Sequence, residues 1–435
     1  MTDTRFDVRA YGAVGDGSTK DTTAIQAAVD ACGAAGGGTV YFPAGKYLCG
    51  SIELRDGVTL YVEKNAVLKA SGDLEDYIDI TARLGELPVE LLEEGNTFSF
   101  IYALHARRVG LDGDGIIDMS DEAFNDFDKM MYSPDIPLES MDEQQKQEGV
   151  YAYHYGKRPT PPLYFFHCTD VSVRRLTLHH APFWTVNFYG CQRVTITGVT
   201  VDNRLNVANC DGIGISGCED VIVSDCHITS ADDCIAIGGD CRRVCITNCT
   251  LRSRSSAVRI GYKQGLLRDI VISNLSLHDC NRAFIIQAAD DCAVENVLIQ
   301  NVVMNTRLFA GEWWGKAEAL SISSVRGKGH IRRVVMSNVV GQCENGIVIC
   351  GQEQGNVSDI VLRDWMLTIC DGPNRAVASY VDLQDEARLP IRPGTIPWRY
   401  CVNARNVRFE NVQVWKADDR LDITPYEENA EILDR

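Results

Sequence analysis

The chain has 435 residues, and its 42 lysine and arginine residues face 60 aspartate and glutamate residues, giving a formal net charge of −18. This charge argues against nucleic acid as a partner, and no apolar run approaches membrane-spanning length. The first residues lack the apolar core of a signal peptide, so the sequence predicts a protein of the reducing cytoplasm.

A helix is expected near the amino terminus. Asp21 is a typical capping residue, and a helix that starts there carries an apolar face made of Ile25, Ala28, Val29 and Cys32. The glycine-rich stretch from 33 to 38 ends it. We expect this helix to cover the open end of a stack of strands, as part of an amino-terminal module in residues 1–50.

The segment from 119 to 158 differs from the sequence around it. It is rich in aspartate, glutamate, methionine and tyrosine, and it interrupts the repeat described next. We interpret it as an insertion that closes one end of a groove or contacts a second copy in a homo-oligomer, the alternative being a solvated excursion.

From about residue 171 to 414 a short pattern recurs about every 25 residues. Apolar residues occupy its positions 0, 2, 5 and 7, as in Val194, Ile196, Val199 and Val201. A straight half-buried strand would keep positions 0, 2, 4 and 6, so the shift marks a corner. The corner position holds residues that tolerate a left-handed bend: Gly198, Asp225, Asn248, Asn274, Asn301, Asn338, Asp364 and Asn411.

Bent strands that repeat at this period predict an all-β fold, a parallel β-helix, as a single domain over residues 1–435. Position 2 of successive coils should then form one buried interior column of Ile196, Val223, Ile246, Ile272 and Ile299.

Several of the 17 cysteines follow the same repeat. Cys191, Cys218 and Cys241 lie three residues before a coil start, and Cys226 and Cys249 occupy position 5. Their spacing matches no zinc motif. We therefore expect an interior stack of small apolar thiols.

A second apolar pair follows in each coil, and the residues two positions before these pairs should stack in a column. Adjacent coils lie about 4.8 Å apart, so Asp211 and Asp233 should be neighbours with Asp232 beside them. Carboxylates stacked this closely repel each other, which indicates a functional groove. The column reads Trp184, Asp211, Asp233, Ser256, Arg282, Glu318 and Asn345.

Several motifs resemble one enzyme family. The opening Phe6-Asp-Val-Arg-Ala-Tyr-Gly resembles pectinase-type β-helix proteins, whereas Ala181-Pro-Phe-Trp-Thr-Val, Asn209-Cys-Asp-Gly212 and Ala231-Asp-Asp-Cys-Ile-Ala-Ile237 resemble glycoside hydrolase family 28, the polygalacturonases. The resemblance implies a right-handed β-helix and hydrolysis with inversion, without metal or cofactor. It further implies that Asp232 protonates the leaving oxygen while Asp211 and Asp233 activate water.

The sequence departs from this family at two places. A family Gly-His-Gly is replaced by Ser255-Ser256-Ala257, and a family Arg-Ile-Lys, whose cations hold a substrate carboxylate, is replaced by Ile285-Ile286-Gln287. A relocated cation could come from elsewhere, or the sugar could be neutral at that subsite. The candidates for the cation are Arg259, Lys263, Arg282 and Lys316.

One coil is lengthened by an insertion at 305–330. Insertions of this kind commonly build the binding face of a solenoid. Its adjacent tryptophans could stack on sugar rings, and Lys316 and Glu318 could bind hydroxyl groups. The full set of predicted substrate-binding residues is Asn209, His180, Trp184, Arg259, Lys263, Arg282, Gln287, Trp313, Trp314, Lys316 and Glu318.

The sequence thus predicts an inverting glycosidase that acts on short plant-cell-wall or related oligosaccharides, with galacturonate not assured. One alternative is a lyase or epimerase of uronic acid sugars, with calcium at the three aspartates and Arg259 or Lys263 as base. Another is a carbohydrate-binding β-helix without turnover. Hydrolysis is favoured because a carboxylate cluster with no cation nearby has little other purpose.

Overall fold

The computed structural model describes residues 4–85, 97–132, 142–148, 150–154, 156–262, 264–310, 314–324, 326–374, 380–382, 388–390 and 395–435. The chain divides into two compact units, residues 1–130 with 152–230 and residues 131–151 with 231–435. The predicted single-domain organisation stays a prediction. Within the described ranges, no helix is long and apolar enough to cross a membrane.

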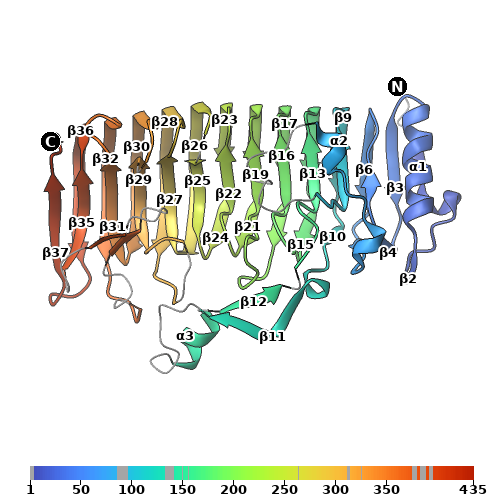
Figure 1. Ribbon diagram of the computed structural model, residues 1–435, viewed down its shortest axis with the longest axis horizontal. Coiled ribbons are helices and arrows are strands. Elements are labelled where there is room, and N and C mark those ends of the chain that lie inside the picture. Colours follow the sequence, from blue (N-terminus) through green and yellow to red (C-terminus); the bar gives the residue numbers. More distant parts are fainter. Residues whose placement is uncertain are drawn as a thin grey trace. The chain divides into compact units, whose positions relative to one another are not determined.

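The first unit is a parallel β-helix in which equivalent strands of successive coils pair in register (Figure 1). Val171 pairs with Val194 and Val194 with Val221, so the apolar positions of the repeat stack inward. One sheet contains β1 (Arg5–Asp7), β2 (Asp16–Lys20), β3 (Gly38–Phe42), β4 (Gly45–Cys49), β6 (Val58–Val62), β7 (Ala66–Ala70), β9 (Arg107–Gly113), β10 (Ile116–Asp118), β14 (Thr169–Arg174), β15 (Thr177–His179), β17 (Gln192–Thr197), β18 (Thr200–Asp202), β20 (Glu219–Ser224) and β21 (His227–Ser230). The other contains β5 (Ile52–Glu53), β8 (Ile101–Leu104), β13 (Leu163–Phe166), β16 (Val186–Tyr189) and β19 (Ile213–Ser216).

The predicted helix is α1 (Thr22–Ala34), and it lies beside β3 at the amino-terminal end of this unit (Figure 1). It buries the predicted apolar face. Asp21 precedes it as expected, but its carboxylate accepts hydrogen bonds from the backbone N–H groups of Val14 (2.7 Å) and Gly15 (3.0 Å) instead of capping the helix. Other short helices that the structure describes in this unit are η1 (Val8–Tyr11), η2 (Leu74–Asp76), α2 (Thr81–Leu84) and η4 (Asp121–Ala123).

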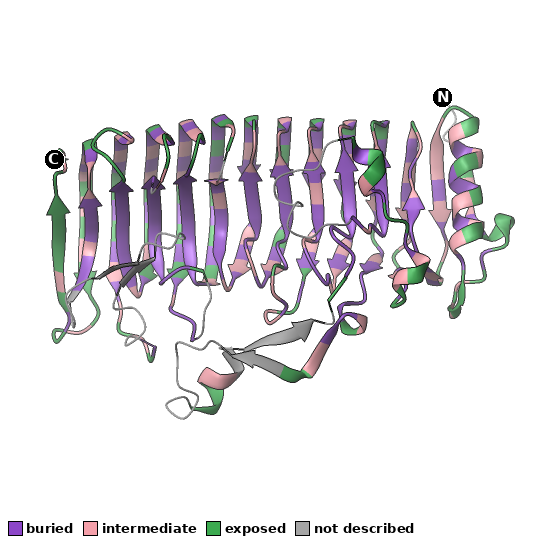
Figure 2. Cartoon of the chain, in the orientation of Figure 1, coloured by how far each residue is buried: buried purple, intermediate pink, exposed green. Residues whose placement is uncertain are grey.

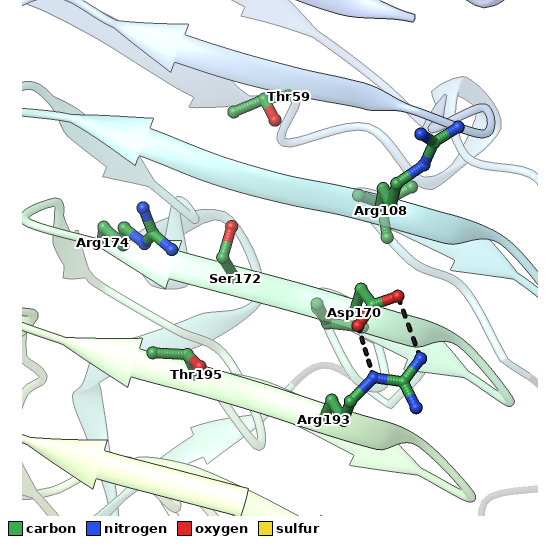
Figure 3. A pocket seen from close by; sticks show the side chains of 9 residues that line it. Thr59, Arg108, Asp170, Ser172, Arg174, Arg193 and Thr195 are labelled. Carbon is green, nitrogen blue, oxygen red and sulfur yellow. Dashed lines mark hydrogen bonds and ion pairs between the residues drawn. The ribbon is translucent and has the colours of Figure 1, made fainter.

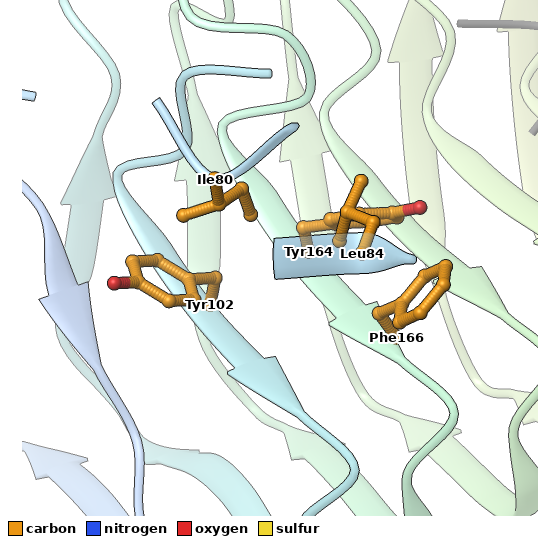
Figure 4. Close-up of a cluster of buried hydrophobic side chains, with 5 residues drawn as sticks. All are labelled: Ile80, Leu84, Tyr102, Tyr164 and Phe166. Carbon is orange, nitrogen blue, oxygen red and sulfur yellow. The ribbon is translucent and has the colours of Figure 1, made fainter. Parts of the chain in front are cut away.

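An aromatic cluster covers the outer face of β8 and β13 (Figure 4). Tyr102, Tyr164 and Phe166 pack there against Ile80 and Leu84 from the α2 region. The partly buried residues that pack against this cluster are Leu104, Trp184 and Tyr189. This part of the sheet is therefore closed to solvent by the protein itself.

The second unit is also a parallel β-helix, with longer strands that run through the corner. One sheet contains β23 (Arg242–Thr247), β24 (Thr250–Ser253), β26 (Leu266–Cys280), β28 (Ala293–Thr306), β30 (His330–Cys343), β32 (Val357–Ile369), β36 (Ala404–Lys416) and β38 (Ile432–Asp434). The other contains β22 (Ile235–Gly238), β25 (Ser256–Tyr262), β27 (Arg282–Ala288), β29 (Glu318–Ser324), β31 (Asn345–Gly351), β35 (Thr395–Val402) and β37 (Asp422–Glu428). A separate antiparallel pair joins β33 (Tyr380–Asp382) to β34 (Arg388–Pro390).

The predicted corners are confirmed at all eight positions, since each has a φ between 53° and 66°. In the second unit their amides also form a ladder. Asn274 donates to Asn248 (3.2 Å), Asn301 donates to Asn274 (3.0 Å) and Asn338 donates to Asn301 (3.0 Å). The side chains thus stabilise the left-handed backbone that the bend requires.

The interior matches the prediction in both units (Figure 2). The five residues of the position-2 column are fully buried, with Ile196 paired to Val223 in the first unit and Ile272 paired to Ile246 and Ile299 in the second. The 17 cysteines are free thiols, and all are buried except the half-buried Cys245 and Cys370. They fill the interior as predicted.

The segment 119–158 contains η4, β11 (Asn125–Tyr132), α3 (Glu143–Glu148) and β12 (Val150–His154). Within the second unit, Gln145 of α3 donates a hydrogen bond to Asn374 (2.8 Å), which in turn donates to the carbonyl of Leu308 (2.9 Å). The proposed roles of this segment as lid or oligomer contact stay predictions.

Candidate functional site

In the first unit, the segment between β18 and β19 carries Asn209 and Asp211. Asp211 is 6% exposed, and its carbonyl accepts hydrogen bonds from the backbone N–H (2.9 Å) and the hydroxyl (2.7 Å) of Thr185. That hydroxyl also accepts from the amide of Asn203 (2.6 Å). The backbone at Asp211 is therefore held from two sides, while Asn209 is exposed with a φ of 56°.

Arg158 contacts this segment, and nothing in the sequence indicated this contact. It is 4% exposed and donates to the carbonyl of Ala208 (3.2 Å) and to the side-chain oxygen of Asn209 (3.2 Å). Its guanidinium lies over the ring of Phe183, 4.6 Å from the ring centroid. Because Arg158 ends the non-repeating segment 119–158, no repeat position could have indicated its place.

In the second unit, Asp232 and Asp233 lie in the turn that precedes β22. Asp233 is 2% exposed and Asp232 is half-buried. The backbone N–H of Asp233 donates to the carboxylate of Asp232 (2.9 Å), and Ser253 donates its hydroxyl to the carbonyl of Asp232 (2.7 Å). Their predicted meeting with Asp211, which belongs to the first unit, stays a prediction.

The two carboxyl groups have different surroundings. Asp233 accepts from the hydroxyl of Ser255 (3.1 Å), from the backbone N–H of Ser256 (3.2 Å) and from the guanidinium of Arg259. Burial, followed by the charge of Asp233, raises the pKa of Asp232 to about 7. The pair can therefore hold a proton on Asp232 near neutral pH.

Arg259 changes one expectation. The sequence suggested that the carboxylates have no cation nearby, and this expectation is wrong because Arg259 binds Asp233 directly from β25. Its Nη1 also donates to the carbonyl of Gly261 (3.2 Å). Arg259 lies between the buried Val258 and Ile260 of β25, and the folded turn shows that it faces Asp233. Direct binding of substrate by Arg259 stays a prediction.

Arg282 and Glu318, predicted as separate substrate ligands, bind each other. Both side chains are fully buried, and the guanidinium donates twice to the carboxylate (3.1 and 3.2 Å). The backbone N–H of Lys316 also donates to Glu318 (2.7 Å). Their direct contact with substrate stays a prediction, and this burial favours a positioning role. Arg282 and Glu318 are neighbours in the predicted column and carry opposite charges, and this was the feature of the sequence that could have indicated the ion pair.

The other predicted ligands of the second unit differ in exposure. Gln287 and Lys316 are buried, at 1% and 4% exposure, whereas Trp314 is 46% exposed and open to contact. Lys263 and Trp313 lie outside the described residues. The binding roles of all five residues stay predictions.

Two predicted ligands of the first unit, Trp184 and His180, pack against neighbouring aromatic side chains. Trp184 is half-buried and packs on Phe183, with ring centroids 4.7 Å apart. His180 stacks on His179 (4.1 Å), and its Nδ1 lies 3.6 Å from Asp118. Its bond to Asp118 raises the pKa of His180. Their substrate contacts stay predictions.

The histidines and Asp118 offer ligand atoms within 4.8 Å of one another, which resembles a metal-binding group. However, the Nζ of Lys69 lies 3.4 Å from Asp118, and the two imidazole rings are parallel within 7°. A metal cannot lie in the plane of two parallel stacked rings. This group therefore fits a hydrogen-bonded cluster better than a metal centre.

A shallow groove of about 370 Å³ lies on the outer face of the larger sheet of the first unit (Figure 3). Arg108, Arg174 and Arg193 surround the hydroxyls of Thr59, Ser172 and Thr195 there. Of the described residues that line it, Asp170 alone carries a carboxylate, and it is bound by Arg193 at 2.6 and 3.0 Å. The groove therefore lacks a pair of carboxyl groups for acid and base chemistry.

Comparison with known proteins identifies related families. The family model described as Glycosyl hydrolases family 28 matches residues 143–380, more than half of the chain. The model described as Rhamnogalacturonase A/epimerase, pectate lyase-like, matches residues 5–125.

Among curated proteins, a probable polygalacturonase of Vitis vinifera is 30% identical over 212 residues, which are 47% of this chain. This chain thus spans 38% of the length of that relative. Mannuronan C5-epimerase AlgE3 of Azotobacter vinelandii is 52% identical over 68 residues, 15% of this chain and 4% of the epimerase.

Solved structures share the fold. The family 28 exopolygalacturonase of Yersinia enterocolitica aligns with a TM-score of 0.73 and 17% identity, over 99% of this chain and 78% of that one. The exopolygalacturonase of Thermotoga maritima aligns with a TM-score of 0.67 and 19% identity, over 85% of this chain and 88% of that one. The predicted right-handed parallel β-helix is confirmed.

Proposed function

Because the chain belongs to family 28 of the glycosyl hydrolases, we propose that it is an inverting glycosidase that hydrolyses short plant-cell-wall or related oligosaccharides. The observation that carries the proposal is the unequal pair in the turn before β22. One carboxyl group, Asp232, has a pKa raised to about 7, and its neighbour Asp233 is held by Arg259. Glycoside hydrolysis needs one carboxyl group that gives a proton and another that activates water.

In this proposal Asp232 is the general acid. At pH values below about 7 it keeps its proton and can transfer it to the leaving glycosidic oxygen as the bond to the anomeric carbon breaks. Burial raises the pKa of Asp232, and its proximity to Asp233 adds to this effect because a second negative charge beside Asp233 would be repelled.

Asp233 and Asp211 would activate the water that attacks the anomeric carbon from the opposite face. The three hydrogen bonds to Asp233 fix the direction of its carboxylate. Asp211 is assigned to this task from the Asn-x-Asp-Gly motif and its one-coil spacing from Asp233. Inversion at the anomeric carbon follows from single displacement by water.

The preference for short oligosaccharides rests on the cations. Arg259 is bound to Asp233, and Arg282 is bound to the buried Glu318. Neither is a ready partner for the carboxylates of a long polyuronate, so galacturonate is not required by the proposal. We also propose a cytoplasmic location, in keeping with an interior filled by free thiols.

Lyase or epimerase chemistry is the less favoured alternative, since the matches to mannuronan epimerases cover small parts of both chains. The decisive experiment is a screen of purified protein against neutral and acidic plant-wall oligosaccharides. We expect new reducing ends and no ultraviolet absorbance from an unsaturated product. Loss of activity with a chelator and recovery with calcium would contradict hydrolysis by paired carboxyl groups.

A further inference from the structure

The strongest unassigned contact in the first unit is the one between Arg158 and Asn209. Arg158 is almost fully buried, yet its guanidinium is directed at an exposed asparagine. The ring of Phe183 supports one face of the guanidinium, and the carbonyl of Ala208 binds its second nitrogen. Three contacts thus fix a planar, charged group in one orientation.

This arrangement determines how the Asn209 amide is turned. A guanidinium has donors only, so the atom that faces it must be the side-chain carbonyl oxygen of Asn209. The NH₂ group of Asn209 then points away from Arg158. Because Asn209 is exposed, it presents two N–H donors to whatever occupies the surface there.

The chain that follows Asn209 is held as well. The Cys210 thiol donates to the carbonyl of Ala181 (3.2 Å), the Ser230 hydroxyl donates to the carbonyl of Cys210, and Thr185 donates to the carbonyl of Asp211. The left-handed conformation of Asn209 turns the chain between the Ala208 carbonyl, which Arg158 binds, and these anchors. The amide therefore has a fixed direction relative to Asp211, two residues away.

We propose that Arg158 is a positioning residue that holds the Asn209 amide so that its NH₂ group donates to an acceptor oxygen of the sugar bound at Asp211. This inference rests on the proposed function, because it takes the bound sugar from it. It assigns Arg158, at the end of the non-repeating segment 119–158, a part in substrate binding without contact to the substrate. Without the guanidinium the amide can turn and present its oxygen, which repels an acceptor.

The test is a double-mutant cycle on an oligosaccharide that the wild type hydrolyses. Loss of one oriented hydrogen bond should lower kcat/KM of Arg158→Gln about 3–10-fold, mostly through KM. Asn209→Ala should show a similar loss, and Arg158→Gln in the Asn209→Ala background should add nothing further. Arg158→Lys should not rescue activity, since an ammonium cannot bind Ala208 and Asn209 as a planar fork.

Arg399→Gln is the matched control. Arg399 is 6% exposed, lies over Trp398 and Phe409, and binds Glu427 and Asp434 in the second unit. Its loss should lower stability while leaving kcat/KM within twofold. Equal losses from Arg158→Gln in both backgrounds, or full activity of Arg158→Gln, would overturn the proposal.

A second measurement is independent of turnover. Asn209→Asp should raise the melting temperature when Arg158 is present, because a carboxylate next to the guanidinium forms an ion pair, and should not raise it in Arg158→Gln. A rise in both backgrounds would overturn the contact. A wild type without hydrolase activity on any oligosaccharide would instead contradict the proposed function, while this cycle would still report the contact.

Discussion

Two kinds of turn in the second unit serve different ends. The corner turns, built on Asn248, Asn274, Asn301 and Asn338, repeat one left-handed conformation and bind one another in a ladder. The site turn, residues 231–234, has a conformation that differs from the described corners. Its hydrogen bonds hold the carboxyl groups of Asp232 and Asp233. Repetition gives stability at the corner, whereas departure from it places a raised-pKa acid beside a second carboxylate.

The largest effect is expected at the site turn. Asp233→Asn should lower kcat/KM by about 10²–10⁴-fold, since it removes a carboxylate that we propose activates water. It should also destabilise the fold, because Arg259 loses its charged partner. Steady-state kinetics and urea unfolding measure both effects.

The double variant Asp233→Asn/Arg259→Gln separates these effects. We expect it to recover part of the lost stability and none of the activity. If activity recovered together with stability, Asp233 would act only as the ion-pair partner of Arg259 and not in the reaction.

Next in size is the effect expected at the buried ion pair of Arg282 and Glu318. Glu318→Gln should cost about 3–5 kcal/mol in the free energy of unfolding, because it leaves the fully buried Arg282 without its counter-charge. Replacing both residues, as in Arg282→Met/Glu318→Gln, should return much of this loss. The rate of the folded fraction should fall by less than tenfold if the pair only supports the site, and a loss of about 10³-fold would make Glu318 or Arg282 a substrate ligand.

The pH dependence of activity and stability distinguishes the site turn from the corner turns, because Asp232 titrates and the corner asparagines do not. Activity should fall as pH rises through about 7, where Asp232 loses its proton. The same pKa lies above the ordinary value of about 3.9, so the folded protein binds this proton more tightly than the unfolded chain. The contribution of Asp232 to stability is therefore present below about pH 4 and is lost as pH rises to about 7.

Urea unfolding between pH 4 and 8 measures this loss. We expect the decline in stability of the wild type to exceed that of Asp232→Asn. An identical decline in both proteins would show that the pKa of Asp232 is not raised.

The smallest effect is expected at the corner. Asn274→Ala should destabilise the fold by about 1–2 kcal/mol, because it removes two ladder hydrogen bonds and a residue that tolerates the left-handed bend. Asn274→Gly keeps the backbone freedom and should lose less. Both should retain wild-type kcat/KM, and a large loss of activity in either would show that corner and site are not separate in function.

The fold was predictable because the apolar pattern that produces it recurs in every coil. The shift from position 4 to position 5 in each coil predicted the corners, and alternating apolar residues predicted the buried column. The sequence also indicated the carboxyl pair, through the motif Ala231-Asp-Asp-Cys.

Partners of the site were harder to predict because they come from places that do not repeat. Arg158 contacts Asn209 across 51 positions, from a segment outside the repeat. Arg259 was recognised as a cation, but whether it faces a substrate or Asp233 depends on the fold of a turn without His. The position of a residue in the repeat predicts whether its side chain faces outward, but it does not predict which residue that side chain will contact.

The central claim is that Asp232 gives a proton to the leaving oxygen. The most direct test compares Asp232→Asn with the wild type on a natural oligosaccharide and on the matching nitrophenyl glycoside, whose leaving group needs no proton. The account predicts a loss of about 10²–10⁴-fold on the oligosaccharide and a much smaller loss on the nitrophenyl glycoside, with the fold intact. Equal losses on both substrates, or near-wild-type activity of Asp232→Asn on the oligosaccharide, would contradict it.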